Sequence, residues 1–262
     1  MSRSTGFAVM CVLMLSFFGN AFATTWFPKE FSCPIDNEKN TFMVIGSYGS
    51  YIYSWPSKYQ WLFFPQTESP TYYMCKKCHL ATYMWDFDKL PKEKLPEIKR
   101  ILSTINVAKP FKDYQEVPLL ERLEAMEKVY SVLGKGEDWW EMFYRVKGYH
   151  NGKAGEAAKA AHARQKSLAN LEKAYADPKS ESPKKLTLYV IASMKHFLND
   201  DSGALATFDK ALATKYENKS ESADDVKAGE EGLNERIKDY ITRIKSEKDK
   251  PRLFDKYSPD EH

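Results

Sequence analysis

Two short stretches of the sequence decide the fold: FSCPIDNEKNTF at residues 31–42 and TYYMCKKCHLATY at residues 71–83. In each, a segment rich in aromatic and β-branched residues runs into a turn, which is typical of a strand entering a hairpin. Cys33 and Asp36 lie in the first turn, and Cys75 and Cys78 lie in the second. This is the layout of a zinc ribbon, in which two hairpin tips converge on one metal ion.

The ligand types in these turns are sufficient for a metal site. Apart from Cys11, the chain has only the cysteines Cys33, Cys75 and Cys78, an odd set that a closed disulfide framework does not explain. A carboxylate oxygen at about 2.0–2.2 Å can complete a tetrahedral zinc site. We therefore predict a zinc ion bound by Cys33, Asp36, Cys75 and Cys78, with His79 as the alternative fourth ligand.

The residues around both turns resemble a family of uncharacterised bacterial proteins. The family pattern is a CPxCG turn followed by Phe, a CPxCGYA turn followed by Asp-Phe, and then tetratricopeptide-like helices. The match covers about residues 31–105, and the chain departs from the pattern at Asp36, Lys76 and His79. The resemblance implies a zinc-ribbon-like head on a helical body, with no established enzymatic activity.

The second turn permits other interpretations. Residues 75–79 also form the C-x-x-C-H signature of covalent haem attachment. In a single-haem c-type cytochrome, Cys75 and Cys78 would bond to the haem vinyl groups and His79 would bind the iron. A disulfide or redox-active pair between Cys75 and Cys78 is a third interpretation. The second axial ligand of such a haem could be any one of six residues: Met84, Met126, Met142, Met194, His150 or His196.

Composition divides the chain into a β-rich head at residues 24–90 and a helical body at residues 91–248. The body is rich in Lys, Glu, Ala and Leu, with apolar residues at helical spacing, so the predicted fold class is α+β. The charged, Pro-interrupted residues 249–262 predict a flexible tail. Helices are expected at about 91–105, 118–133, 137–149, 153–177, 183–198, 201–216 and 221–247.

Residues 186–216 follow the spacing of a tetratricopeptide repeat. In such repeats small residues let two antiparallel helices approach closely, and aromatic residues fill the groove between neighbouring repeats. A plain antiparallel helical bundle is the alternative. Asp200 or Asp201 is placed to cap the helix that follows.

The first 23 residues predict a secretory signal peptide. Arg3 precedes an apolar run from Phe7 to Phe18, and an A-x-A motif ends at Ala23. The apolar run is too short to span a bilayer, and no later stretch is long and apolar enough to do so. We therefore expect an exported protein, periplasmic or secreted, that has no transmembrane segment after cleavage.

The net charge and the motifs that the sequence lacks argue against several classes of protein. Lys and Arg number 39 against 36 Asp and Glu, so the net charge of +3 does not indicate a nucleic-acid binder. The sequence contains no P-loop, nucleophile elbow or dinucleotide fingerprint, so a non-enzymatic role is favoured. An aromatic cluster predicts either strand packing or a contact surface; its members are Tyr48, Tyr51, Tyr53, Trp55, Tyr59, Trp61, Phe63 and Phe64.

Together these features predict an exported, non-enzymatic binding or scaffold protein. Its head would carry a structural zinc ion, and its helical body would present a surface to a protein or peptide partner. The alternative function is electron transfer by a single haem attached at Cys75 and Cys78.

Overall fold

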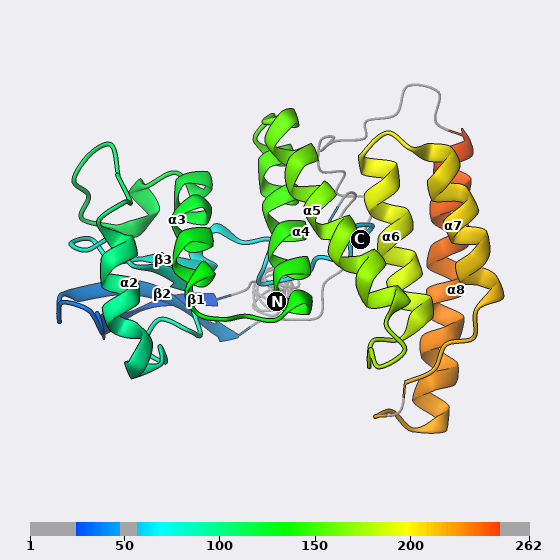
Figure 1. Ribbon diagram of the computed structural model, residues 1–262, viewed down its shortest axis with the longest axis horizontal. Helices are drawn as coiled ribbons and strands as arrows, with labels where there is room; N and C mark the ends of the chain where they lie inside the picture. The colour runs from blue at the N-terminus through cyan, green and yellow to red at the C-terminus, as the bar shows by residue number, and fades with distance from the viewer. Residues whose placement is uncertain (1–24, 48–56, 219, 247–262) are drawn as a thin grey trace, which may run out of the picture.

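A computed structural model describes residues 25–47, 57–218 and 220–246. The predicted signal peptide and tail lie outside these residues. Two β-hairpins and two covering helices lie at one end of the molecule, and the remaining helices extend from them toward the other end (Figure 1). The α+β class is confirmed. The zinc-ribbon and tetratricopeptide descriptions remain predictions.

Both expected hairpins form. Strands β1 (Thr25–Ser32) and β2 (Lys39–Ser47) pair antiparallel, and β3 (Tyr72–Met74) and β4 (Ala81–Tyr83) form a second antiparallel pair. The alternation expected of a half-buried strand is clear in β2, where Asn40 and Phe42 are buried and Thr41 is exposed. The last paired residues before the turns are Ser32 with Lys39 and Met74 with Ala81.

Aromatic side chains join the two hairpins. Phe42 of β2 stacks on Tyr73 of β3, with ring centroids 4.1 Å apart, and Phe87 packs edge-on against Phe42 at 4.7 Å. Helices α2 (Leu95–Leu102) and α3 (Leu119–Ser131) cover them. The same hydrophobic core continues past residue 90 into α4 (Glu137–Lys153).

Buried Arg122 ties α3 to the second hairpin. Its guanidinium donates hydrogen bonds to the backbone oxygens of Tyr72 at 2.6 Å, Ser69 at 3.0 Å and Val117 at 3.1 Å. Carbonyl groups thus replace the water that a buried cation would lose, although burial still lowers the pKa of Arg122 to about 10.

The seven α-helices among the described residues match the seven predicted ranges, with every end within four residues of its predicted position. Helical periodicity combined with Pro and Gly stops is the strongest such signal in a sequence, which explains the agreement. Asp200 rather than Asp201 caps α7, because Asp200 Oδ1 accepts a hydrogen bond from Gly203 N at 2.9 Å. The helices not yet given are α5 (Ala157–Ala176), α6 (Lys184–Phe197), α7 (Asp201–Ala213) and α8 (Ala223–Ser246).

Consecutive helices of the body pack in short-loop pairs, α4 with α5 and α6 with α7. Gly148 of α4 faces α5, since a Cβ there would be 2.8 Å from Arg164 Cγ. No helix in the described part of the chain is long and apolar enough to cross a membrane.

A segment from the head also enters the body. We call residues 57–62 the connecting segment. Ser193 of α6 donates a hydrogen bond to Tyr59 O at 2.7 Å, and Arg145 of α4 donates to Trp61 O at 2.7 Å. The ring of Tyr59, fully buried, lies 4.6 Å from that of Tyr240 in α8. Tyr59 therefore belongs to a second core, which α6, α7 and α8 enclose.

Part of the predicted aromatic cluster lies in this connecting segment. Tyr59 and Trp61 sit in turns rather than in a strand, and they pack against the helices. Arg236 of α8 lies over the Trp61 ring, 4.8 Å from its centroid. The members at 48, 51, 53 and 55 lie outside the described residues.

Candidate metal centre

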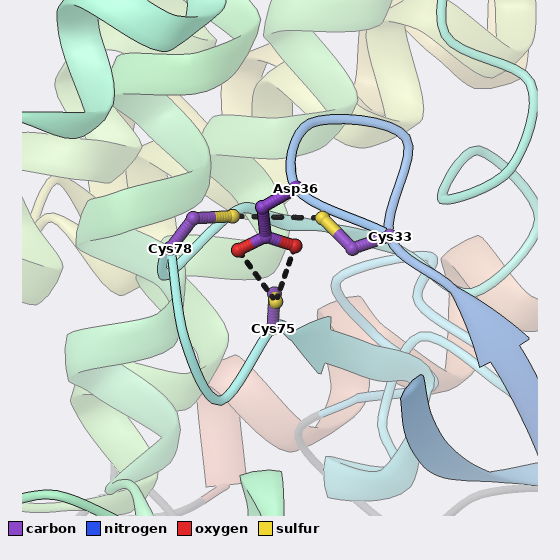
Figure 2. A group of neighbouring side chains, drawn as sticks. All are labelled: Cys33, Asp36, Cys75 and Cys78. Atoms are coloured by element: carbon purple, nitrogen blue, oxygen red, sulfur yellow. Dashed lines mark hydrogen bonds between the residues drawn. The ribbon is translucent and has the colours of Figure 1, made fainter. Parts of the chain in front are cut away.

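The four predicted ligands converge. One ligand atom from each of Cys33, Asp36, Cys75 and Cys78 lies within 4.8 Å of each of the others. Cys33 and Asp36 come from the tip of the first hairpin, and Cys75 and Cys78 from the tip of the second (Figure 2). Residues 39 or more positions apart are thus brought together by the stacking of the two hairpins.

The two tips have the same backbone structure. Cys33 N donates to Glu38 O and Asn37 N donates to Cys33 O, both at 2.9 Å. In the second tip Cys75 N donates to Leu80 O at 2.9 Å, and His79 N donates to Cys75 O at 3.0 Å. Asp36 therefore occupies the place in the first tip that Cys78 occupies in the second.

His79 is held at a position of this turn that excludes it from the ligand group. Its φ of 61° matches the 59° of Asn37 in the other tip, a left-handed conformation that glycine adopts without strain. The His79 ring stacks on Phe111 with centroids 5.9 Å apart. The geometry therefore gathers Asp36 and not His79 with the three thiols.

The distances suit a tetrahedral ion. Ligands at about 2.0–2.3 Å from a tetrahedral zinc ion are separated by roughly 3.3–3.8 Å. The Sγ atoms of Cys33 and Cys78 are 3.5 Å apart, and Cys75 Sγ lies 3.9 Å from Asp36 Oδ1. These two edges lie within a few tenths of an ångström of the tetrahedral values, and all four ligand atoms lie within 4.8 Å of one another.

Asn40 braces both tips. Its side-chain amide donates to Glu38 O at 3.0 Å and to Cys75 Sγ at 3.5 Å, and its Oδ1 accepts from Lys76 N at 2.9 Å. An ion pair between Lys76 and Glu38, 3.1 Å long, crosses the same junction. Sequence reasoning did not identify Asn40. The one feature of the sequence that could have identified it is that Asn40, a polar amide, occupies an inward-facing position of the predicted strand.

Hydrogen bonding among the three thiols sets their protonation. Hydrogen bonds from the Cys33 and Cys78 thiols lower the pKa of Cys75 to about 2. The hydrogen bond to Cys75 raises the pKa of Cys33 to about 12, and the contact with Cys33 raises that of Cys78 further still. One thiolate is therefore accommodated without a cation, whereas a divalent ion would stabilise all three.

The structure places the other predicted groups as follows. Cys33, Cys75 and Cys78 are free thiols. Among the residues suggested as second haem ligands, His196 Nδ1 lies 2.7 Å from Asp201 Oδ1, and His150 Nε2 lies 2.9 Å from Gln66 O. Met142 Sδ accepts a hydrogen bond from Gln66 Nε2 at 3.1 Å. Met126 and Met194 are buried in the first and second core, and Met84 is partly buried against the first.

Comparison with protein-family models, curated proteins and solved structures gives no match.

Proposed function

We propose that the protein is an exported, non-enzymatic scaffold protein whose head is held together by a structural zinc ion. The observation that carries this proposal is the convergence of three free thiols and one carboxylate from two equivalent hairpin tips. Cys33, Asp36, Cys75 and Cys78 would supply the four ligands. The resemblance to proteins with a zinc-ribbon-like head and tetratricopeptide-like helices supports the same proposal.

The donor set favours zinc over other common ions. Calcium and magnesium select oxygen ligands in larger coordination shells, whereas thiolates select zinc and other soft or borderline ions. Three sulfur donors and one oxygen at tetrahedral spacing fit a structural zinc site. The ion would add a cross-link between two-stranded sheets that are marginally stable on their own.

We assign the helical body to contact with a protein or peptide partner. This assignment is supported by its helix pairs, since stacked pairs build extended binding surfaces. It is also supported by the connecting segment, an aromatic stretch of chain that already packs against α4, α6 and α8. Export is proposed from the signal-peptide pattern alone.

The experiment is metal analysis with an absorption spectrum of the full chain, produced through export in a host that attaches haem. We expect about one zinc per chain and no visible absorption band. Replacing Asp36 by Ala should lower zinc affinity, while Asp88→Ala, a control in the same head with an exposed side chain, should retain it.

The same measurement separates the alternatives. Covalently bound haem with iron would overturn the zinc proposal in favour of the cytochrome. A chain that contained neither zinc nor iron would contradict the proposal of a metal site altogether. With zinc present, chelation should accelerate hydrogen exchange in β1 to β4 far more than in α6 to α8. Equal acceleration in both parts would contradict a role confined to the head.

A further inference from the structure

The metal centre is closed on one side and open on the other. Cys33 and Cys75 are completely buried, whereas Asp36 and Cys78 are only partly buried. Both partly buried ligands line a pocket of about 470 Å³, together with His79, Lys77 and Lys99. All four positions of the proposed zinc site are filled by protein ligands, so a further ligand arriving through this pocket would have to displace Asp36 or Cys78.

One of the two ligands at the opening, Asp36, is also the weakest of the four. A carboxylate oxygen is a harder donor than a thiolate and holds zinc less firmly. Asp36 does not depend on the ion for a partner, because its Oδ1 accepts a hydrogen bond from Glu38 N at 3.0 Å. If the carboxylate left the ion, it would keep this hydrogen bond and face the pocket.

The pocket adds positive charge to the opening. Lys77 lies within the second hairpin tip and Lys99 lies on α2, and neither has an ion-pair partner in the part of the chain that the structure describes. Lys76, by contrast, is paired with Glu38. An anionic group entering the pocket would meet the two lysines that line it.

We propose, on the basis of the zinc site proposed above, that this opening binds a low-molecular-weight thiol bearing a carboxylate. A thiolate is the ligand class that binds zinc better than the carboxylate it would displace. With zinc bound, the thiol would lose its proton to solvent and its sulfur would take the position of the Asp36 carboxylate, which would be released with its negative charge. No electron is transferred. The carboxylate of the ligand pairs with Lys77 and Lys99.

The test uses the full chain loaded with Co²⁺, whose absorption reports sulfur ligation. L-Cysteine is titrated in, and the thiolate-to-cobalt charge-transfer band should grow by about a third as three sulfur ligands become four. Cysteamine, which lacks the carboxylate, should bind more weakly, and L-serine, which lacks the thiol, should leave the band unchanged. Lys99→Gln should weaken cysteine binding by about two- to fivefold and should not weaken the binding of cysteamine, which has no carboxylate to pair with Lys99.

The matched control is Asp36→Cys, which closes the site with a fourth protein thiolate. Its band should start at the higher intensity and should not respond to L-cysteine. An unchanged band in the wild-type protein, or loss of cobalt to free cysteine in place of band growth, would overturn the proposal. A protein that shows no charge-transfer band before any thiol is added would instead overturn the metal site itself.

Discussion

At the scale of single residues, Asn40 joins the two hairpin tips and orients Cys75 through one buried amide. Replacing it by Ala removes all three hydrogen bonds, so we expect zinc affinity to fall by about 10- to 100-fold. A chelator competition assay measures this change. Asn37→Gly is the control, because glycine adopts the left-handed backbone of position 37. Equal affinities of the Asn40 variant and the wild type would show that the ligands need no such support.

His150 provides a pH-dependent contribution to stability. It is buried beside Gln66 and Tyr72, and burial lowers its pKa to about 4 from 6.5. The unfolded chain therefore binds a proton more readily, so the contribution is complete above about pH 6.5 and is lost as the pH falls toward 4. Between pH 7 and pH 5 the loss should be about 2 kcal/mol.

Urea unfolding of the metal-free protein measures this effect without a contribution from metal release. The wild type should lose about 2 kcal/mol more than His150→Gln over the same pH interval. If the two proteins lost the same free energy, His150 would be protonated in the native state as readily as in the unfolded chain.

The residues that bind metal could be predicted from the sequence, whereas those that support them could not. Cysteines and a carboxylate at matching positions of two turns indicate metal binding by their residue types and their spacing. Asn40 is one of many amide residues, and its role depends on the packing of one hairpin on the other. The sequence alone does not decide whether His79 is a metal ligand. Its separation from the ligand group follows from the left-handed backbone at position 79.

At the scale of elements, the start of α7 depends on Asp200. Its carboxylate satisfies a backbone N–H that would otherwise lack a partner, so Asp200→Ala should cost about 0.5–2 kcal/mol of unfolding free energy. Asp209→Ala removes the same charge from the exposed middle of α7 and is the control. Thermal or chemical unfolding compares the two, and an equal cost would show that charge rather than capping is responsible.

Helices and hairpins could be predicted because their signals are local. Repeating apolar positions, Pro and Gly stops and strand alternation are all contained within a single element. The connecting segment could not be assigned in the same way. Tyr59 and Trp61 have the composition of strand residues, but their positions are fixed by side chains of α4, α6 and α8 that lie far along the chain.

At the scale of the whole molecule, Tyr59 links the head to the last helices. Tyr59→Ala would leave a cavity in the second core and should cost about 3–5 kcal/mol. Tyr59→Phe keeps the ring and removes only the hydroxyl that donates to Asp239, so its cost should be nearer 1 kcal/mol.

Hydrogen exchange shows where the Tyr59→Ala effect falls. Amides of α6 and α8 should exchange faster, while those of β3 and β4 should keep their protection. Uniform loss of protection across the chain would mean that the two cores unfold as one unit.

The path of the connecting segment has a consequence for the order of folding. The chain contributes to the first core, crosses to the second at Tyr59, and returns to the first before any helix of the body has been made. Tyr59 and its partner Asp239 are 180 residues apart. On a ribosome that adds about 5–20 residues per second, Tyr59 would wait on the order of ten seconds for α8. Contacts this distant in sequence slow folding, so the nascent chain is expected to expose aromatic side chains until synthesis is almost complete.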